Sequence, residues 1–202
     1  MSIYGEYLPA LKEVMERIVG RIESFNEAYQ KEHGEPLYEH LNYRIKREES
    51  MLEKLERKHL EATTYNALVT LKDAIGLRIV TTFVDDVFEV VRLIKGLEFV
   101  NVVEEKDYIS HAKENGYRSY HMIIQVTSHQ KDVLGHQPGS FYVEIQIRTI
   151  AMDSWAALEH QMSYKKNIKN RELISSELKR VADELASCDL SMQTIRDLIN
   201  RS

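Results

Sequence analysis

Residues 141–148 read FYVEIQIR, and the rest of the chain is interpreted outward from them. Apolar residues fill every second position and alternate with Tyr142, Glu144, Gln146 and Arg148. A period of two predicts a β-strand whose side chains point to opposite faces. We expect one face to lie on a core. The other carries a carboxylate, an amide and a guanidinium in a row, a pattern that by itself also suits an ordinary solvated strand.

The overall composition is that of a globular protein. Of 202 residues, 43% are hydrophobic and 29% are charged, which suits a single domain with a real core. The net charge of −5 argues against a general nucleic-acid coat, and we expect no nucleic acid to be needed for catalysis. The single cysteine, Cys188, excludes an internal disulfide framework. Without a signal-peptide pattern or a long apolar run, the expectation is a cytoplasmic protein with no membrane partner.

Two long amphipathic helices are expected towards the ends of the sequence. Apolar residues recur with heptad-type spacing over residues 4–32 and again over residues 171–200. Each seam suits packing within the domain, packing of the two helices against each other, or a subunit interface. We predict an N-terminal helix within residues 1–35 and a C-terminal helix within residues 170–202, and we expect the latter to mediate oligomerisation.

Between these helices the pattern changes repeatedly between strand and helix. We expect a helix over residues 44–60 with Ile45, Leu52 and Leu55 on its buried side. Its cations form either a phosphate-binding edge or a solvated, salt-bridged face. The other expected elements are a strand over 75–83 followed by a helix ending at Gly96, a strand over 99–103, a strand after Asn115-Gly116, and a helix over 150–167.

The sequence lacks the common nucleotide-binding and catalytic motifs. There is no GxxxxGK[ST], GxGxxG, HExxH, CxxC or GxSxG pattern. Any phosphate binding must therefore come from Arg and Lys side chains and a carboxylate-held metal. Asp73, just before a strand, and Glu144, inside another, could share a hard cation such as Mg²⁺. The cations that could neutralise a triphosphate are Arg44, Lys46, Lys54 and Arg78.

A second set of polar residues surrounds the strand that follows Asn115-Gly116. Tyr117 and His121 share one face of this strand, after a loop that carries Lys106 and Lys113. Tyr117 offers a flat ring on which a base could stack. The alternative is an aromatic side chain packed on its neighbours, beside a histidine satisfied by ordinary hydrogen bonds.

Four motifs, taken together, resemble the RelA/SpoT-type synthetase domain, and more closely a stand-alone small alarmone synthetase. They are RIKREESMLEKL at 44–55, DAIGLRIV at 73–80, KDYISHAKENGYRSYHMII at 106–124, and EIQIRT at 144–149 followed by AMDSWAALEH. The resemblance covers residues 40–165. NGYRSYH with a downstream EIQIRT is the most specific pair.

This resemblance implies an α+β fold, with a mixed β-sheet of the nucleotidyltransferase-like synthetase type flanked by helices and amphipathic helices at both ends. It implies one synthetase domain over 1–202 with a catalytic core at 40–165. The implied reaction transfers pyrophosphate from ATP to the 3′-hydroxyl of GDP or GTP, giving ppGpp or pppGpp and AMP. A homotetramer is implied as the assembly.

The resemblance also implies roles by motif position. Asp73 and Glu144 match the magnesium ligands, and Glu144 is also the candidate that activates the attacking hydroxyl. The ATP-binding set is Arg44, Lys46, Ser50, Lys54 and Arg78. The GDP- or GTP-binding set is Lys106, Lys113, Asn115, Tyr117, His121 and Gln146, with Tyr117 stacking on guanine.

Three departures from the family pattern matter. Glu104 stands where long bifunctional enzymes carry a basic residue two places before the Lys-Asp pair. No His-Asp dipeptide occurs, so synthesis without hydrolysis is expected. His40 and Asn42 stand where some small synthetases carry an allosteric Phe and Thr, which favours a RelP-like over a RelQ-like member. The competing interpretations are a guanine-nucleotide sensor without chemistry and a different nucleotidyltransferase that releases pyrophosphate.

Overall fold

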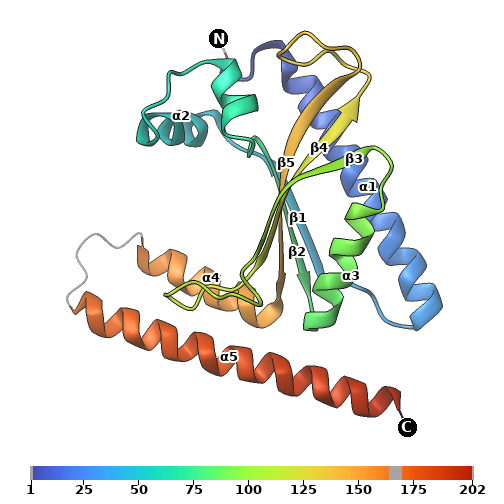
Figure 1. Ribbon diagram of the computed structural model, residues 1–202, viewed down its shortest axis with the longest axis vertical. Coiled ribbons are helices and arrows are strands. Elements are labelled where there is room, and N and C mark those ends of the chain that lie inside the picture. The colour runs from blue at the N-terminus through green and yellow to red at the C-terminus, as the bar shows by residue number, and fades with distance from the viewer. Residues whose placement is uncertain (1, 164–169, 202) are drawn as a thin grey trace.

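Five strands form a single mixed sheet at the centre of the molecule (Figure 1). The computed structural model describes residues 2–163 and 170–201. The sheet order is β1-β2-β5-β4-β3, with β2 and β5 parallel and all other neighbours antiparallel. The strands are β1 (His40–Ile45), β2 (Ile75–Thr81), β3 (Val100–Asp107), β4 (Tyr120–Ser128) and β5 (Gly139–Thr149). The predicted FYVEIQIR strand is therefore central, and the expected α+β class is confirmed.

The central strand owes its position to its alternating pattern. Phe141, Val143, Ile145 and Ile147 are each at most 3% exposed, whereas the alternate residues Tyr142, Glu144 and Gln146 are partly exposed. Burial of one such apolar side chain contributes about 1.5–3 kcal/mol. A shift of one residue in register would exchange the two faces and lose this burial. The apolar alternation thus determines which face of β5 presents its polar residues.

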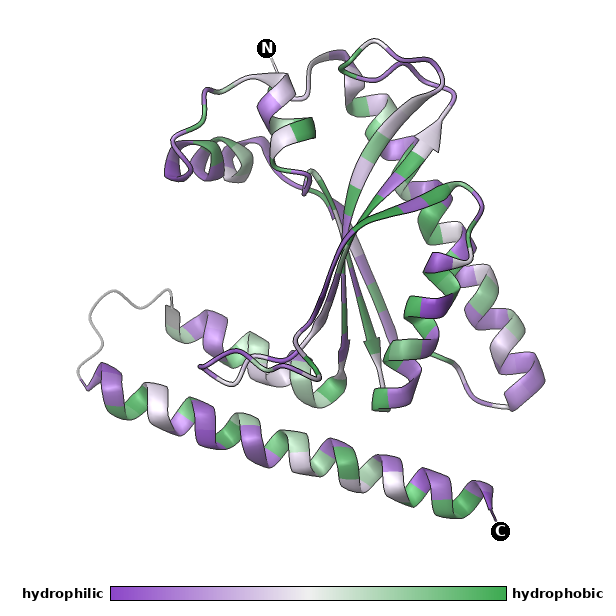
Figure 2. Ribbon diagram, viewed as in Figure 1, coloured by the Kyte–Doolittle hydropathy of each residue, from purple (hydrophilic) through white to green (hydrophobic). Residues whose placement is uncertain are grey.

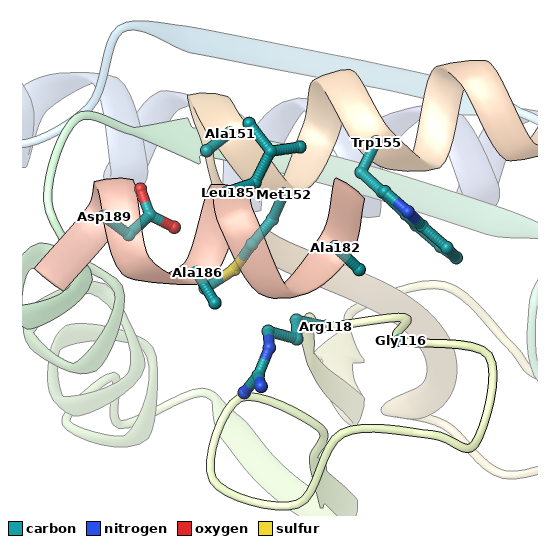
Figure 3. Close-up of a pocket in the computed structure, with 9 residues that line it drawn as sticks. All are labelled: Gly116, Arg118, Ala151, Met152, Trp155, Ala182, Leu185, Ala186 and Asp189. Carbon is teal, nitrogen blue, oxygen red and sulfur yellow. The ribbon is translucent and has the colours of Figure 1, made fainter. Parts of the chain in front are cut away.

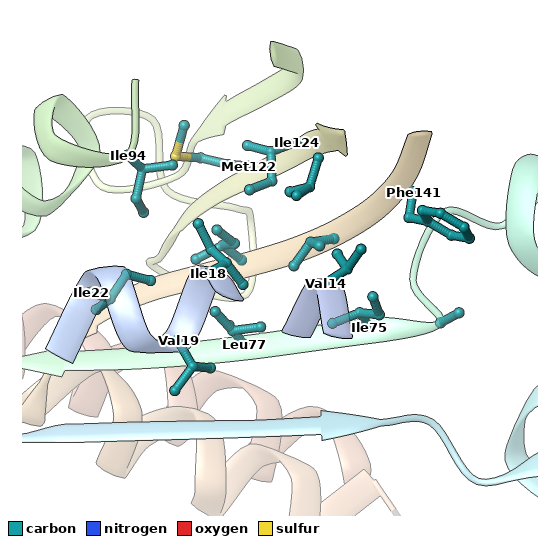
Figure 4. Packing of buried hydrophobic residues seen from close by; sticks show 14 of the residues in the cluster. Val14, Ile18, Val19, Ile22, Ile75, Leu77, Ile94, Met122, Ile124 and Phe141 are labelled. Carbon is teal, nitrogen blue, oxygen red and sulfur yellow. The ribbon is translucent and has the colours of Figure 1, made fainter. Parts of the chain in front are cut away.

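Helices α1 (Leu8–His33) and α3 (Val84–Lys95) cover the apolar face of the sheet (Figure 1). A short 3₁₀ turn, η1 (Gly5–Tyr7), precedes α1. Val14, Ile18 and Ile22 of α1 pack with strand residues in one continuous core, which Figure 4 shows at close range. The heptad-type seam of α1 is therefore used within the domain, as the simpler interpretation predicted.

The opposite, polar face lies between two other groups of helices (Figure 1). At one end are α2 (Glu48–Arg57) and the π-helical turn η2 (Asn66–Thr70). At the other end are α4 (Ile150–Ser163) and α5 (Arg171–Asn200), which pack along each other. α4 contacts β2 and β5, and α5 also reaches α3. The space above the polar face is thus bounded by α2 on one side and α4 on the other.

α5 uses only part of its predicted seam. Leu178, Val181 and Leu185 of the seam pack against the cluster that contains Trp155 of α4. Ile195 and Ile199 of the same seam are 58% and 68% exposed, as is the neighbouring Leu190 at 67%. Figure 2 shows hydrophobic and hydrophilic residues mixed along this helix. No helix within the described ranges is long and apolar enough to span a bilayer.

The predicted helix over residues 44–60 is wrong at its start. Arg44 and Ile45 belong to β1, which pairs antiparallel with β2, and α2 begins only at Glu48. Residues 40–45 pair with the edge of β2, and this tertiary contact overrides the apparent helical spacing. As a result Met51 and Leu55 form the buried side of α2, and Leu52 is 42% exposed.

Two smaller expectations also need correction. β3 continues to Asp107, so Lys106 lies on a strand rather than in a loop. Tyr117 precedes β4, which begins only at Tyr120, so Tyr117 and His121 do not share a strand. The predicted helix over 150–167 is described only to Ser163, and residues 164–169 lie outside the described ranges.

Candidate active site

Two cross-strand rows of side chains run across the polar face of the sheet. In the first row Arg44 is opposite Gly76, Gly76 is opposite Glu144, and Ile123 separates Glu144 from Glu104. Directly opposite residues share a face, and neighbouring strands lie about 4.8 Å apart. Glu144 is therefore held at the centre of the row, next to a glycine that leaves space above the sheet.

The second row lies two residues further along β2 and β5. It runs from Asn42 through Arg78, Gln146 and His121 to Lys106. These residues come from all five strands of the sheet, and they are far apart in the sequence. The fold thus places the predicted Arg78, Gln146, His121 and Lys106 side by side.

A pocket of about 100 Å³ lies over β3, β4 and β5 and is lined by residues of both rows. Its lining includes the carboxylates of Glu104 and Glu144 together with Lys106 and His121. Lys106 Nζ lies 2.5 Å from Glu104 Oε1. The pKa of Lys106 is raised, first by this hydrogen bond and the charge of Glu104, with a smaller contribution from Glu144. Lys106 therefore stays positively charged beside Glu144.

Asp73 is the centre of a cationic cluster at the α2 end of the site. Its side chain is 5% exposed, and its Oδ2 pairs with the ammonium groups of Lys46 and Lys54, the latter at 2.6 Å. The backbone N–H of Lys46 also donates to the carbonyl of Ala74. The structure therefore brings together three of the predicted site residues, Asp73, Lys46 and Lys54. Ser50 lies one turn before Lys54 on α2 and is exposed.

The second oxygen of Asp73 fits a metal ligand. Oδ1 is buried and accepts no hydrogen bond from any described residue. Among the described residues there is no group of three or more His, Cys, Asp or Glu side chains that could hold a metal. Mg²⁺ is commonly bound through one or two carboxylates, with phosphate oxygens and water completing its shell. The residues present thus suit a cation that binds together with a phosphate.

At the opposite end of the site, Arg148 forms hydrogen bonds with several side chains. It is 5% exposed, and its Nη2 donates to both Tyr117 Oη and Gln146 Oε1 at 2.7 Å. Nη1 donates to Asp153 Oδ1 at 3.1 Å, and Nε donates to Ser119 Oγ at 3.3 Å. The sequence left the role of Arg148 open, and the structure shows a buried ion pair that also holds two predicted acceptor-side residues.

The rings around Tyr117 form an aromatic cluster. Tyr117 Oη lies 2.7 Å from His121 Nε2, and Tyr108 packs edge-on against both rings. The ammonium group of Lys113 lies 4.8 Å from the centre of the Tyr117 ring and 4.5 Å from that of Tyr108. Tyr108 was not predicted from the sequence, although it directly follows the Lys106-Asp107 pair.

His121 is held in its neutral form. Burial lowers its pKa to about 4, assisted by the positive charges of Arg148, Lys113 and Lys106. A neutral imidazole has one donor and one acceptor nitrogen. Tyr117 Oη accepts a hydrogen bond from Arg148 and is also hydrogen-bonded to His121 Nε2, so the tyrosine hydroxyl holds the neutral imidazole in place.

The loop before β4 packs against α5. Gly116 has a φ of +89°, and a Cβ there would lie 2.5 Å from the Cβ of Ala182. Asn115 Oδ1 accepts a hydrogen bond from the backbone of Tyr117 at 3.1 Å. A cavity of about 10 Å³, with room for about one water molecule, lies beside this contact (Figure 3). Arg118 Nε and Asp189 Oδ1, on residues that line this cavity, are buried without a partner among the described residues.

Two predicted ATP-side residues lie apart from the Asp73 cluster. Arg44 is exposed on the edge strand β1. Arg78 lies in the second row, is 47% exposed and pairs with Asp153 at 3.5 Å. Asp153 therefore links Arg78 with Arg148, a connection that no sequence pattern indicated. Both arginines remain accessible to a ligand on the polar face.

Comparisons with known proteins agree with this arrangement. The sequence model of a protein family, described as the region found in RelA/SpoT proteins, matches residues 43–169. GTP pyrophosphokinase YwaC of Bacillus subtilis (strain 168) is 36% identical over 196 residues, which are 97% of this chain and 91% of the relative. GTP pyrophosphokinase YjbM of the same organism is 33% identical over 197 residues, covering 96% and 88%.

A solved structure shares the whole fold. The small alarmone synthetase 1 from Bacillus subtilis, bound to its product pppGpp, superimposes with a TM-score of 0.81 at 32% identity. The match covers 96% of this chain and 95% of that one. It therefore includes both end helices as well as the sheet.

Proposed function

The chain belongs to the RelA/SpoT family, and we propose that it is a GTP pyrophosphokinase that makes the alarmones ppGpp and pppGpp. It transfers pyrophosphate from ATP to the 3′-hydroxyl of GDP or GTP and releases AMP. The observation that carries this proposal is the place of Glu144 on the polar face. Glu144 lies between the Asp73–lysine cluster on one side and the Tyr117–His121–Gln146 group on the other.

The donor side suits the triphosphate of ATP. Lys46 and Lys54 are held on Asp73, and both can turn towards phosphate oxygens once these enter the site. Arg44 and Arg78, from adjacent strands, flank the adenine end, and Ser50 adds a hydroxyl from α2. Asp73 and Glu144 would hold Mg²⁺, which when bound neutralises charge on the phosphate oxygens. The unpartnered Oδ1 of Asp73 supports this assignment.

The acceptor side suits a guanosine phosphate. The Tyr117 ring offers a stacking surface for guanine, and Gln146 and Asn115 supply amide groups beside it. Lys106, Lys113 and neutral His121 provide hydrogen-bond donors for the phosphates and ribose. These roles are supported by the shared face of the second row and by the family motifs that these residues occupy.

The reaction is a displacement at the β-phosphorus of ATP. The 3′-oxygen of the acceptor forms a bond to this phosphorus while the bond to the α-phosphate oxygen breaks, and AMP leaves with that electron pair. The proton of the 3′-hydroxyl passes to the Glu144 carboxylate. Catalysis rests on alignment of the two nucleotides and on neutralisation of the spreading charge by the lysines and arginines.

A product analysis tests this function. The protein is incubated with ATP, Mg²⁺ and either GDP, GTP or GMP, and the nucleotides are resolved. We expect AMP together with a guanosine tetra- or pentaphosphate, and a Glu144→Gln variant should form neither. Free pyrophosphate would identify a different nucleotidyltransferase, and nucleotide binding without turnover would identify a sensor.

We also propose a homotetramer of single-domain chains whose catalytic core is residues 40–165. The exposed Leu190, Ile195 and Ile199 on α5 support an apolar contact between copies. The single cysteine supports a reducing compartment such as the cytoplasm, and the missing His-Asp dipeptide supports synthesis without hydrolysis. A light-scattering mass of 23.6 kDa, that of one chain, at micromolar concentration would contradict the tetramer.

A further inference from the structure

Arg148 is a buried cation in a site built for anions, yet it does not face the ligand space. Only 5% of the residue is exposed, so a phosphate could reach it only by displacing its partners. Burial of a charge is costly unless the group is paired and hydrogen-bonded. Asp153 supplies the counter-charge at 3.1 Å, but that pairing alone does not require the further bonds to Tyr117 and Gln146.

The guanidinium uses its geometry to join side chains from different elements. Its Nη2 reaches Tyr117, which precedes β4, and Gln146, which is two residues earlier on β5. Nη1 reaches α4 through Asp153, and Nε reaches Ser119. A planar fork with fixed donor directions sets all of these distances at once, which the single ammonium of a lysine cannot do.

A relay continues from Arg148 through Tyr117 to His121. The Tyr117 oxygen accepts a hydrogen bond from the guanidinium and is hydrogen-bonded to His121 Nε2 at 2.7 Å. The ring orientation of Tyr117 and the amide orientation of Gln146 are therefore fixed by one buried side chain, and His121 is tied to it through the tyrosine hydroxyl. Gln146 and His121 are opposite each other in the second row, so the three groups face the same space.

We propose that Arg148 is a positioning residue that pre-organises Tyr117, Gln146 and His121 for the guanosine acceptor. This inference rests on the proposed function of that site. Arg148 itself touches neither nucleotide. Its main effect is on acceptor binding, because Lys46 and Lys54 on the ATP side are held by Asp73. Arg78 is connected to Arg148 only indirectly, through Asp153, and its longer contact with that carboxylate is 3.5 Å.

The test is a double-mutant cycle between Arg148→Lys and Tyr117→Phe. Arg148→Lys keeps the charge and removes the fork, and Tyr117→Phe keeps the stacking ring and removes the hydroxyl. Each variant should raise the KM for GDP about 10-fold while the KM for ATP changes less than about twofold, since both variants lose the charge-assisted hydrogen bond between Arg148 and Tyr117. In the double variant, the KM for GDP should rise by less than the product of the two single-variant increases, because both changes break the same bond.

Arg180→Lys is the matched control. Arg180 is an exposed arginine on α5 that pairs with Glu177 and Glu184, so this variant undergoes the same chemical change away from the site. Its KM values should equal those of the wild type. Melting temperatures of all variants establish that they are folded, and Tyr117→Phe tests the same bond if Arg148→Lys does not fold.

Calorimetric titration with GDP provides a readout without turnover. We expect the Kd for GDP to rise about 10-fold in Arg148→Lys and in Tyr117→Phe. Unchanged GDP affinity, fully multiplicative effects, or an equal rise in the KM for ATP would each overturn the positioning role. If the wild type binds GDP but forms no AMP, the proposed function fails while the effect on GDP affinity still decides the role of Arg148. A wild type that binds neither GDP nor GTP overturns both.

Discussion

The donor and acceptor ends of the polar face are stabilised in different ways. Around Asp73, two lysines share one carboxylate oxygen while the other oxygen has no partner among the described residues. Around Arg148, each of the three guanidinium nitrogens donates a hydrogen bond, and a second layer of rings and α5 lies behind it. The donor end is held by two lysines on one carboxylate oxygen, and the acceptor end by a planar group that bonds four side chains.

This difference suits the two ligands. A triphosphate is highly charged, and lysines on flexible side chains can reorient to contact its oxygens. When it binds, these oxygens replace Asp73 as the anionic partner of the lysines. A guanine ring and a 3′-hydroxyl need a defined orientation, which a rigid, hydrogen-bonded surface provides at low entropic cost. The two ends should therefore respond differently to substitution.

The largest effect is expected at the donor end. Asp73→Asn removes the negative charge that holds Lys46 and Lys54 and that would bind Mg²⁺. We expect turnover to fall by about 10²–10³-fold or more, to a level near loss of activity, while the fold is retained. AMP release and far-ultraviolet circular dichroism are the measurements. Activity near that of the wild type would remove Asp73 from the metal site.

At the acceptor end, Tyr117→Ala should weaken acceptor use without loss of turnover at saturation. Loss of a stacking surface worth about 1–3 kcal/mol predicts a rise of about 10–100-fold in the KM for GDP or GTP. The KM for ATP should change little. Steady-state kinetics with each nucleotide varied in turn measures both values, and an unchanged acceptor KM would exclude stacking on this ring.

A smaller effect is expected where α5 supports the acceptor loop. Gly116→Ala places a methyl group 2.5 Å from the Cβ of Ala182 on a backbone with a φ of +89°. We expect the free energy of unfolding to fall by about 1–3 kcal/mol, measured by urea denaturation. Gly20→Ala on α1, where a Cβ has no neighbour within 4 Å, is the control and should not destabilise. Equal stability of the two variants would show that α5 does not press on the loop.

The smallest effect concerns pH. The pKa of His121 is about 4 in the folded protein, below the usual value of about 6.5, so the unfolded chain binds its proton first as pH falls. The contribution of this residue to stability is complete above pH 6.5 and is lost progressively towards pH 4. Between pH 7 and 5 the wild type should therefore lose more unfolding free energy than His121→Gln. Parallel losses in the two proteins would show that His121 is not buried as a neutral ring.

Several elements followed from local patterns alone. The alternation in residues 141–148 indicated β5, and the 3.6-residue spacing of Val87, Val90, Val91 and Ile94 indicated α3. The start of α2 was missed because residues 40–45 have no strong pattern of their own and become a strand only by pairing with β2. The choice of a RelP-like branch rests on His40 and Asn42 and stays a prediction.

By itself, the sequence determined the central strand, the helices at both ends and the residue types available for chemistry. Periodicity is a local property, and it decides which face of an element is apolar. Only the tertiary structure decided that Asp73 holds Lys46 and Lys54, and that Arg148 joins Tyr117 to Gln146. Those contacts depend on the parallel pairing of β2 with β5 and on the packing of α4 and α5 behind the acceptor loop. Long-range geometry of this kind has no signature in the spacing of residues along one segment.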